Sequence, residues 1–358
     1  MKISSTKKNY RLDSHKLIYH PQRVSEWLEK GDTYPLEVEI SPSSMCNHRC
    51  IFCALDYLGH EKNLLDKNVI IRTIDELQAK GLKSVVCAGE GEPLLNPDMP
   101  DIAVALKNIG VDVAMSTNGA LFAQDKIRHC LSAFTWVRFS IASFDVNAYQ
   151  KIHRCSPHDL AKVKNNLAYA IEVKRNLGLK TTIGVQTLLL PANEKRIVDM
   201  AKELRDIGVD YFTLKPYMVH DFMQDIIAVN YAPPDGLEEE LAQLETVAFR
   251  IYFRTGAMAK LNQQKPYDRC HALPFMVYIS GDGNVWPCVE HVQREGFCYG
   301  NINESSFAAI WEGEQRQQVL KQMERMNMQQ LCSASCRMDE MNRYLWELKH
   351  PGEHVNFI

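Results

Sequence analysis

The sequence predicts an α/β fold, a partial (β/α)6 barrel followed by a small cysteine-rich extension of α+β structure. Short β-prone runs alternate with helical stretches from about Leu36 to Pro216. The alternation stops after Pro216, and five of the eleven cysteines follow Tyr267 in a loop-rich stretch. Strands and helices that alternate along a chain favour a parallel sheet with right-handed crossovers.

The individual elements follow from local patterns. Apolar residues at helical spacing follow Asp66, a suitable N-cap, and predict the first helix of the barrel. Six runs are predicted as strands: Leu36–Ile40, Ser84–Ala88, Val111–Ser116, Val137–Ala142, Thr181–Thr187 and Tyr211–Lys215. Further helices are expected near Ile102–Leu106, Lys126–Ser132, Leu160–Leu177 and Glu194–Ile207. A closed TIM barrel has about eight such units, so six predict an open, TIM-like partial barrel.

The end of the strand–helix alternation, together with the distribution of cysteines, divides the chain into four expected parts. We expect residues 1–33 to form an N-terminal extension and residues 34–234 to form the barrel. Residues 235–265 are expected to be a linker with a helix over Glu238–Tyr252, and residues 266–358 a cysteine-rich domain. A last amphipathic helix is expected after Cys336.

Composition and charge exclude several classes of protein. A hydrophobic content of 46% and a charged content of 24% are those of a globular protein. The net charge of −3 gives no basic field for nucleic acid. No apolar run approaches the roughly 20 residues that span a bilayer, and Met1–His20 lacks a secretory signal. We therefore expect a cytoplasmic protein without a nucleic-acid or membrane partner.

Three cysteines stand close together after the first predicted strand, as Cys46-x3-Cys50-x2-Cys53. A reducing cytosol does not sustain disulfides, so closely spaced thiols point to a metal centre. Three thiolates can hold three irons of a [4Fe–4S] cube and leave the fourth iron open. Zinc is the alternative, with His48 as a fourth ligand. The spacing favours an iron–sulfur cluster but does not exclude zinc.

This loop, with Phe52 before its last cysteine, resembles the C-x3-C-x-Φ-C signature of the radical SAM superfamily, in which Φ is aromatic. The resemblance extends to about residue 216. It implies that Cys46, Cys50 and Cys53 ligate the cluster and that S-adenosylmethionine (SAM) binds the open iron. Electron transfer then gives a 5′-deoxyadenosyl radical. An electron donor such as flavodoxin or ferredoxin is implied as a partner.

Residues at the ends of later strands resemble the SAM-binding positions of that family. Gly91-Glu92-Pro93 resembles the end of its Gly-Gly-Glu-Pro motif, although Glu90 stands where a second glycine is common. The tip of the third strand and one serine of the fourth are similar to the family as well. The resemblance implies cofactor contacts by Gly91, Glu92, Pro93, Ser116, Asn118 and Ser140.

A second group comprises Cys270, Cys288, Cys332 and Cys336. Turn-forming residues over 280–284 lie between β-prone flanks and predict a hairpin that brings Cys270 and Cys288 together. Four thiolates make a closed site, which suits an iron–sulfur cluster or a structural zinc. The pattern resembles the Twitch extension, a shortened SPASM domain, and implies one auxiliary [4Fe–4S] cluster in a redox role.

The remaining cysteines and histidines lack ligand spacing. Cys87 and Cys130 are expected to be buried structural thiols. Cys155 and Cys298 are loop thiols, and some members of the family return hydrogen to a substrate from such a group. Cys298 is our candidate hydrogen donor. His153, His220, His271 and His291 are interpreted as surface or substrate-pocket residues.

Three functions are carried forward. The first is a radical SAM enzyme that oxidises, epimerises or rearranges a small polar substrate, with a sugar, nucleotide-sugar or aminocyclitol preferred by analogy. The second is a radical SAM enzyme that modifies a ribosomally made peptide. The third, from another class, is a zinc-stapled binding protein without catalysis.

Overall fold

A computed structural model describes residues 15–357 except 218, 220–221, 224–225, 230–231, 261–262, 329–331 and 333–335. Its centre is one curved sheet with the strand order β10-β9-β8-β1-β2-β3-β4-β5-β6-β7. The strands are β1 (Glu37–Ile40), β2 (Ser84–Cys87), β3 (Asp112–Thr117), β4 (Phe134–Ser140), β5 (Thr182–Leu189), β6 (Tyr211–Pro216), β7 (Arg250–Phe253), β8 (Met276–Ile279), β9 (Asn284–Trp286) and β10 (Gly300–Asn301).

The six expected strands form and lie side by side in chain order, all parallel. The sheet also gains a parallel strand on each side. β7 pairs with β6, and β8 pairs with β1 so that Val38 is level with both Val85 and Val277. β9 and β10 continue antiparallel from β8 and end the sheet, so within the described chain the sheet stays open between β7 and β10.

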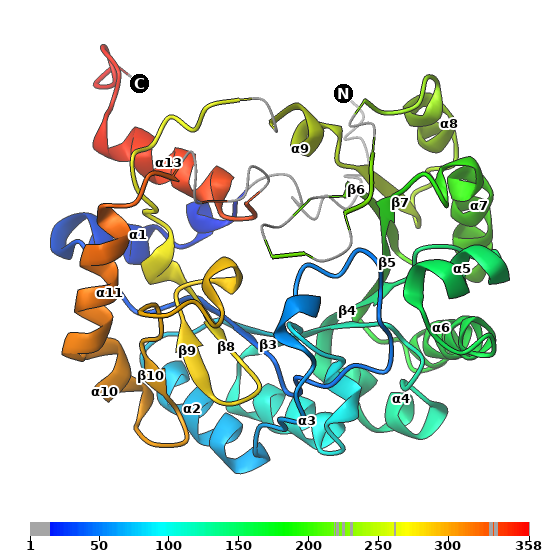
Figure 1. Ribbon diagram of the computed structural model, residues 1–358, viewed down its shortest axis with the longest axis horizontal. Coiled ribbons are helices and arrows are strands. Elements are labelled where there is room, and N and C mark those ends of the chain that lie inside the picture. The colour runs from blue at the N-terminus through cyan, green and yellow to red at the C-terminus, as the bar shows by residue number, and fades with distance from the viewer. Residues whose placement is uncertain are drawn as a thin grey trace.

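Helices cover the convex side of this sheet. Figure 1 shows α2, α3, α4, α6 and α7 in order around its outside. Their bounds are α2 (Lys67–Ala79), α3 (Met99–Ile109), α4 (Gln124–Cys130), α6 (Asp159–Asn176) and α7 (Ile197–Ile207). As expected, Asp66 caps α2, because its carboxylate accepts from the N–H groups of Asn68 and Val69. One further helix, α5 (Val146–His153), was not expected from the sequence.

The helix expected over Glu238–Tyr252 is wrong in its second half. Helix α8 spans only Leu237–Gln243, and Arg250–Phe253 is strand β7, with Tyr211 level with Arg250. Ile251, Tyr252 and Phe253 are β-prone side chains. The free edge of β6 gives them a partner, which local periodicity does not reveal.

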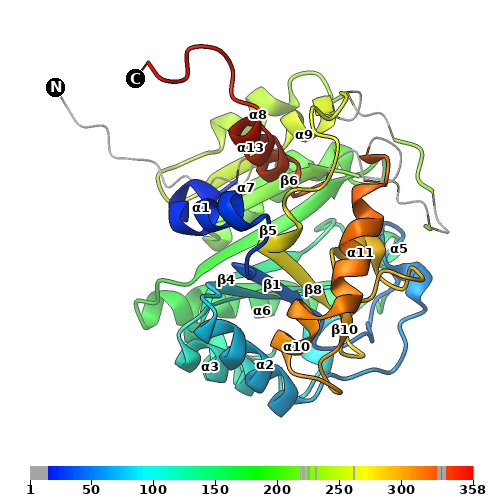
Figure 2. The same ribbon diagram turned by 90° about the vertical axis from the view of Figure 1, so that its left-hand side faces the viewer.

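A second, smaller core joins the two ends of the chain. Helix α1 (Pro21–Lys30) and the expected C-terminal helix, α13 (Asp339–Lys349), lie near each other in both views (Figures 1 and 2). Trp27 of α1 and Leu345 of α13 belong to one buried cluster that also contains Phe275 and Cys288. The N-terminal segment thus helps to enclose the region of the second cysteine group. No helix within the described residues is both long and apolar enough to cross a bilayer.

Candidate functional site

The first cysteine loop leaves the carboxyl end of β1 and is held by backbone hydrogen bonds from two sides. Arg49 N–H donates to the carbonyl of His153 (3.0 Å), and Ile51 N–H donates to that of Ile152 (2.9 Å), at the end of α5. On the other side, the N–H of Glu92 donates to the carbonyl of Met45 (2.8 Å). Parallel α/β proteins bind ligands at this end of their strands.

The loop brings Cys46, Cys50 and Cys53 together. Burial raises the pKa of all three thiols, that of Cys46 to about 12, and each thiol lies within electrostatic reach of the other two. Backbone N–H groups of His48 and Leu55 face the sulfurs of Cys46 and Cys53. Converging thiols with N–H donors suit an anionic iron–sulfur cluster. Binding it must release the thiol protons.

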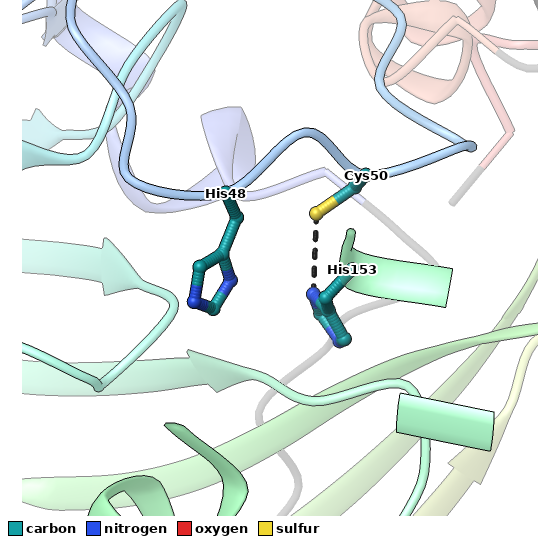
Figure 3. A group of neighbouring side chains, drawn as sticks. All are labelled: His48, Cys50 and His153. Carbon is teal, nitrogen blue, oxygen red and sulfur yellow. Dashed lines mark hydrogen bonds between the residues drawn. The ribbon is translucent and has the colours of Figure 1, made fainter. Parts of the chain in front are cut away.

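A buried histidine contacts the middle cysteine. His153 Nδ1 lies 3.1 Å from Cys50 Sγ (Figure 3), and its Nε2 accepts a hydrogen bond from the N–H of Ala142 (3.0 Å). Burial lowers the pKa of His153 to about 3, so the ring is neutral. A neutral imidazole carries one proton, and Nε2 is an acceptor, so Nδ1 carries the hydrogen and donates to Cys50.

The same tautomer excludes His153 as a metal ligand. One nitrogen each of His48 and His153 lies with Cys50 Sγ in a group whose atoms are all within 4.8 Å. His153 offers that group a hydrogen and not a lone pair. His48, on the same loop (Figure 3), directs Nε2 to Asp159 Oδ2 at 3.3 Å. Its partner is thus a carboxylate on α6, which speaks against His48 as a fourth cluster ligand.

Gly91 is required by the close approach of two backbones. A Cβ on this residue would lie 2.2 Å from the carbonyl oxygens of Ser43 and Met45. The glycine therefore allows the tip of β2 to touch the cysteine loop. Pro93 is buried in a short 3-10 turn over Pro93–Leu95 that follows directly.

The carboxylate of Glu92 is engaged by the protein itself. It accepts hydrogen bonds from the Thr117 hydroxyl (2.6 Å) and from the N–H groups of Asn118 (2.7 Å) and Leu94 (3.2 Å). The side-chain amide of Asn118 in turn donates to Asn47 Oδ1 (2.7 Å), and Asn47 belongs to the cysteine loop. Glu92 and Asn118, both expected to contact the cofactor, thus form hydrogen bonds that hold the cysteine loop.

Ser116 and Ser140 lie on the concave side of the sheet. Both are partly accessible, whereas their neighbours Thr117 and Phe139 are buried. The hydroxyl of Ser116 accepts long contacts of 3.4 Å from the guanidinium of Arg138. Two of the six expected cofactor residues therefore face the space below the cysteine loop.

The second cysteine group also converges. The thiols of Cys270, Cys288, Cys332 and Cys336 all lie within electrostatic reach of one another, and burial raises the pKa of each, that of Cys270 to about 11. Met338 N–H donates to Cys336 Sγ (3.4 Å), and the Asn342 amide donates to Cys270 Sγ (3.5 Å). The expected hairpin joins β8 to β9. Four converging thiols from the protein can close a [4Fe–4S] cluster or a tetrahedral zinc site.

The hairpin tip rests on the first cysteine loop. A Cβ on Gly281 would lie 2.4 Å from the hydroxyl of Ser44, and the N–H of Gly281 donates to Glu90 Oε1 (2.7 Å). The glutamate that departs from the family pattern thus joins the two cysteine-bearing regions. Local sequence gives no sign of this contact or of the Cys50–His153 contact.

The other cysteines and histidines are placed as follows. Cys87 and Cys130 are buried, as expected. Cys298 Sγ contacts the carbonyl of Gly300 (3.4 Å) near β9 and β10, whereas Cys155 lies within electrostatic reach of Cys50. His153, His271 and His291 are all buried, so their interpretation as surface residues is wrong, although His271 lines a cavity beside Trp27. His220 lies outside the described residues.

Comparison with known proteins matches two regions of the chain, each of which contains one of the two cysteine groups. Residues 40–204 match the family model described as the radical SAM superfamily, and residues 270–337 match that of SPASM, an iron–sulfur cluster-binding domain. One relative is the tungsten-containing aldehyde ferredoxin oxidoreductase cofactor-modifying protein of Pyrococcus furiosus, 26% identical over 76% of this chain and 79% of the relative. Another is a probable GTP 3′,8-cyclase of Methanococcus maripaludis, 25% identical over 55% of this chain and 67% of the relative.

Solved structures share the fold. SuiB of Streptococcus suis, bound to its precursor peptide SuiA, superposes with a TM-score of 0.68 at 16% identity and covers 94% of this chain and 78% of SuiB. The enzyme anSMEcpe with bound SAM gives 0.56 at 15% identity and covers 88% of this chain and 99% of anSMEcpe.

The two matched domains contain the two converging cysteine groups, and they imply [4Fe–4S] clusters and SAM as cofactors. The chain is therefore an enzyme of the radical SAM superfamily that carries a C-terminal SPASM-type iron–sulfur domain.

Proposed function

We propose that Cys46, Cys50 and Cys53 hold the SAM-cleaving cluster and that the resulting radical abstracts hydrogen from a polar substrate on the concave side of the sheet. When bound, the cluster supplies the electron that splits SAM into methionine and the 5′-deoxyadenosyl radical. The observation that carries this proposal is three converging thiols on one loop at the carboxyl end of β1. His48, the nearest alternative ligand, is bonded to Asp159.

The residues around the loop have separate tasks in this proposal. Gly91, Glu92, Pro93 and Asn118 fix the loop through the contacts described above, so they orient the cluster ligands. Ser116 and Ser140 are accessible from the concave side and are proposed to contact SAM. A precise frame matters because a small displacement of reacting groups costs much of the rate.

The second cysteine group is proposed to hold one auxiliary [4Fe–4S] cluster with all four ligands from the protein. Full ligation leaves no iron open for a substrate, so the cluster is assigned to electron transfer between the substrate radical and a carrier such as flavodoxin or ferredoxin. The hydrogen bonds from Met338 and Asn342 to two of its thiols support a redox site, because such bonds tune cluster potentials.

A small polar molecule is the substrate class that we favour. Side chains on the concave side include Arg138, Gln186 and Lys215, all partly accessible, and such a lining suits polar groups. The relatives reported above are not named for carbohydrate chemistry, so we do not narrow the substrate to a sugar. A peptide is the second candidate, because SuiB shares the fold over most of this chain and was crystallised with a precursor peptide.

Cys298 stays the proposed hydrogen donor, with Cys155, the other loop thiol, as the alternative. Cys155 lies close to Cys50, while Cys298 lies beside the hairpin. A donor thiol acts after SAM cleavage. Cys155→Ala and Cys298→Ala should therefore both form 5′-deoxyadenosine, and the variant that no longer forms product identifies the donor.

The test is anaerobic purification and reconstitution, followed by iron, sulfide and 5′-deoxyadenosine measurements. About eight irons and eight sulfides per chain are expected for two cubes. Cys46→Ala should lose reductive SAM cleavage, whereas Cys130→Ala, a buried thiol of α4, should keep it. Zinc in place of iron, or cleavage retained by Cys46→Ala, would contradict the proposal. Incubation with metabolite and peptide pools then separates the two substrate classes.

A further inference from the structure

The concave side of the sheet holds accessible space. Outward-facing strand residues such as Val113, Val137 and Phe212 are 0% exposed beneath the helices. Residues that alternate with them, such as Arg138 and Ser140, keep partial exposure although they lie on a central strand. Strand side chains alternate between faces, so the accessible set lines one side. We call this space the lumen.

Four cationic side chains gather in this lumen. Arg138 comes from β4 and Lys215 from β6, and Arg254, whose N–H bonds to the carbonyl of Leu214, follows β7. Arg337 enters from the C-terminal region. The charges of Arg138, Arg254 and Arg337 all act on Lys215, and together with burial they lower its pKa well below the usual value.

Acidic groups compensate these charges only in part. Glu39 of β1 pairs with Arg337. Burial raises the pKa of the second nearby carboxyl group, that of Glu37, which favours its neutral form. Within the described residues, Glu37 and Glu39 are the carboxyl groups that act on this cluster, and burial shifts both Glu37 and Lys215 toward their neutral forms.

Two of these basic side chains contact no carboxylate among the described residues, although the charge of Glu39 acts on both. The Lys215 ammonium makes no hydrogen bond or ion pair within the part of the chain that the structure describes. Arg138 contacts the Ser116 hydroxyl at 3.4 Å and the ring of Trp136 at 5.1 Å, both neutral. Largely enclosed basic groups that contact no carboxylate are costly to keep charged, and a bound anion would stabilise their charged forms.

Neutral polar groups without partners lie between these two cations. Gln186 of β5 is level with Thr213 of β6. Along the strands, this pair lies between the level of Arg138 and the level of Lys215. The Gln186 Oε1 and the Thr213 hydroxyl are buried and lack a hydrogen-bond partner. The Thr213 hydroxyl and the Gln186 amide can each donate to an anionic oxygen.

We propose that Arg138 and Lys215, with Thr213 and Gln186 between them, bind an anionic group of the substrate, a carboxylate or a phosphate. This inference rests on the proposed function, because it places the substrate of the radical in the lumen. It narrows the substrate class from polar to anionic. The guanidinium of Arg138 offers the planar donor pair that carboxylates and phosphates accept, and Lys215 adds a point charge.

The experiment uses anaerobic holoenzyme saturated with SAM and titrates it calorimetrically with two probes, inorganic pyrophosphate and tricarballylate. At least one probe should bind the wild type, and which one binds better separates phosphate from carboxylate recognition. Lys215→Met and Arg138→Gln should weaken that binding at least tenfold. Lys215→Arg should restore it to within threefold of wild type. Lys202→Met, an exposed lysine of α7, is the matched control and should bind like wild type.

SAM affinity, melting temperature and 5′-deoxyadenosine formation are measured on the same variants. SAM affinity should stay within twofold in every variant, because a parallel loss would mean that these cations hold the SAM carboxylate. Lys215→Met should melt at or above the wild-type temperature, since it removes an amino group that burial and three neighbouring cations disfavour in its charged form. Neither probe binding the wild type, or unchanged binding in Lys215→Met, overturns the site. If 5′-deoxyadenosine is not formed while the probes behave as expected, the proposed function fails and the anion site stands.

Discussion

The carboxylate of Glu90 accepts a 2.7 Å hydrogen bond from the N–H of Gly281, 191 residues later in the chain. This bond ties the tip of β2 to the hairpin of the SPASM region. Gly281 also lies against Ser44, two residues before the first cluster cysteine. The two cysteine-bearing regions are therefore joined by a direct hydrogen bond and a close backbone contact.

Glu90→Ala should lower stability by about 1–3 kcal/mol, because it leaves the buried N–H of Gly281 without an acceptor. The measurement is thermal unfolding of the anaerobic holoenzyme together with its iron content. Glu90→Gln keeps an acceptor oxygen and should behave much like wild type. Equal losses in the two variants would show that the charge, and not the hydrogen bond, holds the hairpin.

Gly91→Ala should displace the first cysteine loop. Its Cβ would meet the carbonyl oxygens of Ser43 and Met45 at 2.2 Å, and backbone atoms cannot yield as a flexible side chain can. We expect the iron content to fall from about eight to about four per chain, because only the SAM-cleaving cluster is lost. Gly256→Ala is the control, since a Cβ there meets nothing within 4 Å. A full iron content in Gly91→Ala would contradict the close approach.

His153→Leu should make the SAM-cleaving cluster harder to reduce. The N–H of His153 donates to Cys50, and such a bond stabilises the more negative, reduced cluster. A differential stabilisation of about 1 kcal/mol corresponds to a potential about 40 mV lower in the variant. Redox titration followed by electron paramagnetic resonance measures this shift directly, without turnover.

A matched variant separates the hydrogen bond from packing. His153→Gln can keep an N–H near Cys50 and should recover much of the potential, whereas leucine cannot. Burial and contacts with Tyr149 and Phe52 change in both variants. Potentials equally shifted in leucine and glutamine variants would assign the effect to packing instead.

Local sequence predicted most of the sheet, because each of its six central strands is a short apolar run between helical stretches. It failed where pairing is non-local. Strand β8 is parallel to β1, yet they are more than 230 residues apart, and the pairing is visible only in three dimensions. Strand β7 was merged into a helix because the helical pattern of Leu237–Gln243 leads into it.

The candidate site likewise contains some residues that local sequence predicts and others that it does not. The two converging cysteine groups could be predicted from spacing, because both include cysteines a few residues apart. His153, Glu90 and Lys215 could not, because each acts on residues far away in the chain and is of an ordinary type for its position. The carboxylate of the expected motif residue Glu92 also accepts hydrogen bonds within the protein, from Asn118 and Thr117, which the motif alone does not reveal.

The auxiliary cluster should be separable from SAM cleavage. In a Cys270→Ala/Cys288→Ala double variant, iron should fall from about eight to about four per chain, because two of four ligands are missing. Dithionite-driven 5′-deoxyadenosine formation should persist, since Cys46, Cys50 and Cys53 are held by α5 and by the tips of β2 and β3. Cys87→Ala, a buried thiol of β2 outside both groups, controls for the loss of a core cysteine. Substrate turnover should stop in the double variant if the second cluster transfers electrons, and continued turnover would reduce it to a structural element. Zinc recovered from the wild type at this site would instead identify it as a structural zinc site.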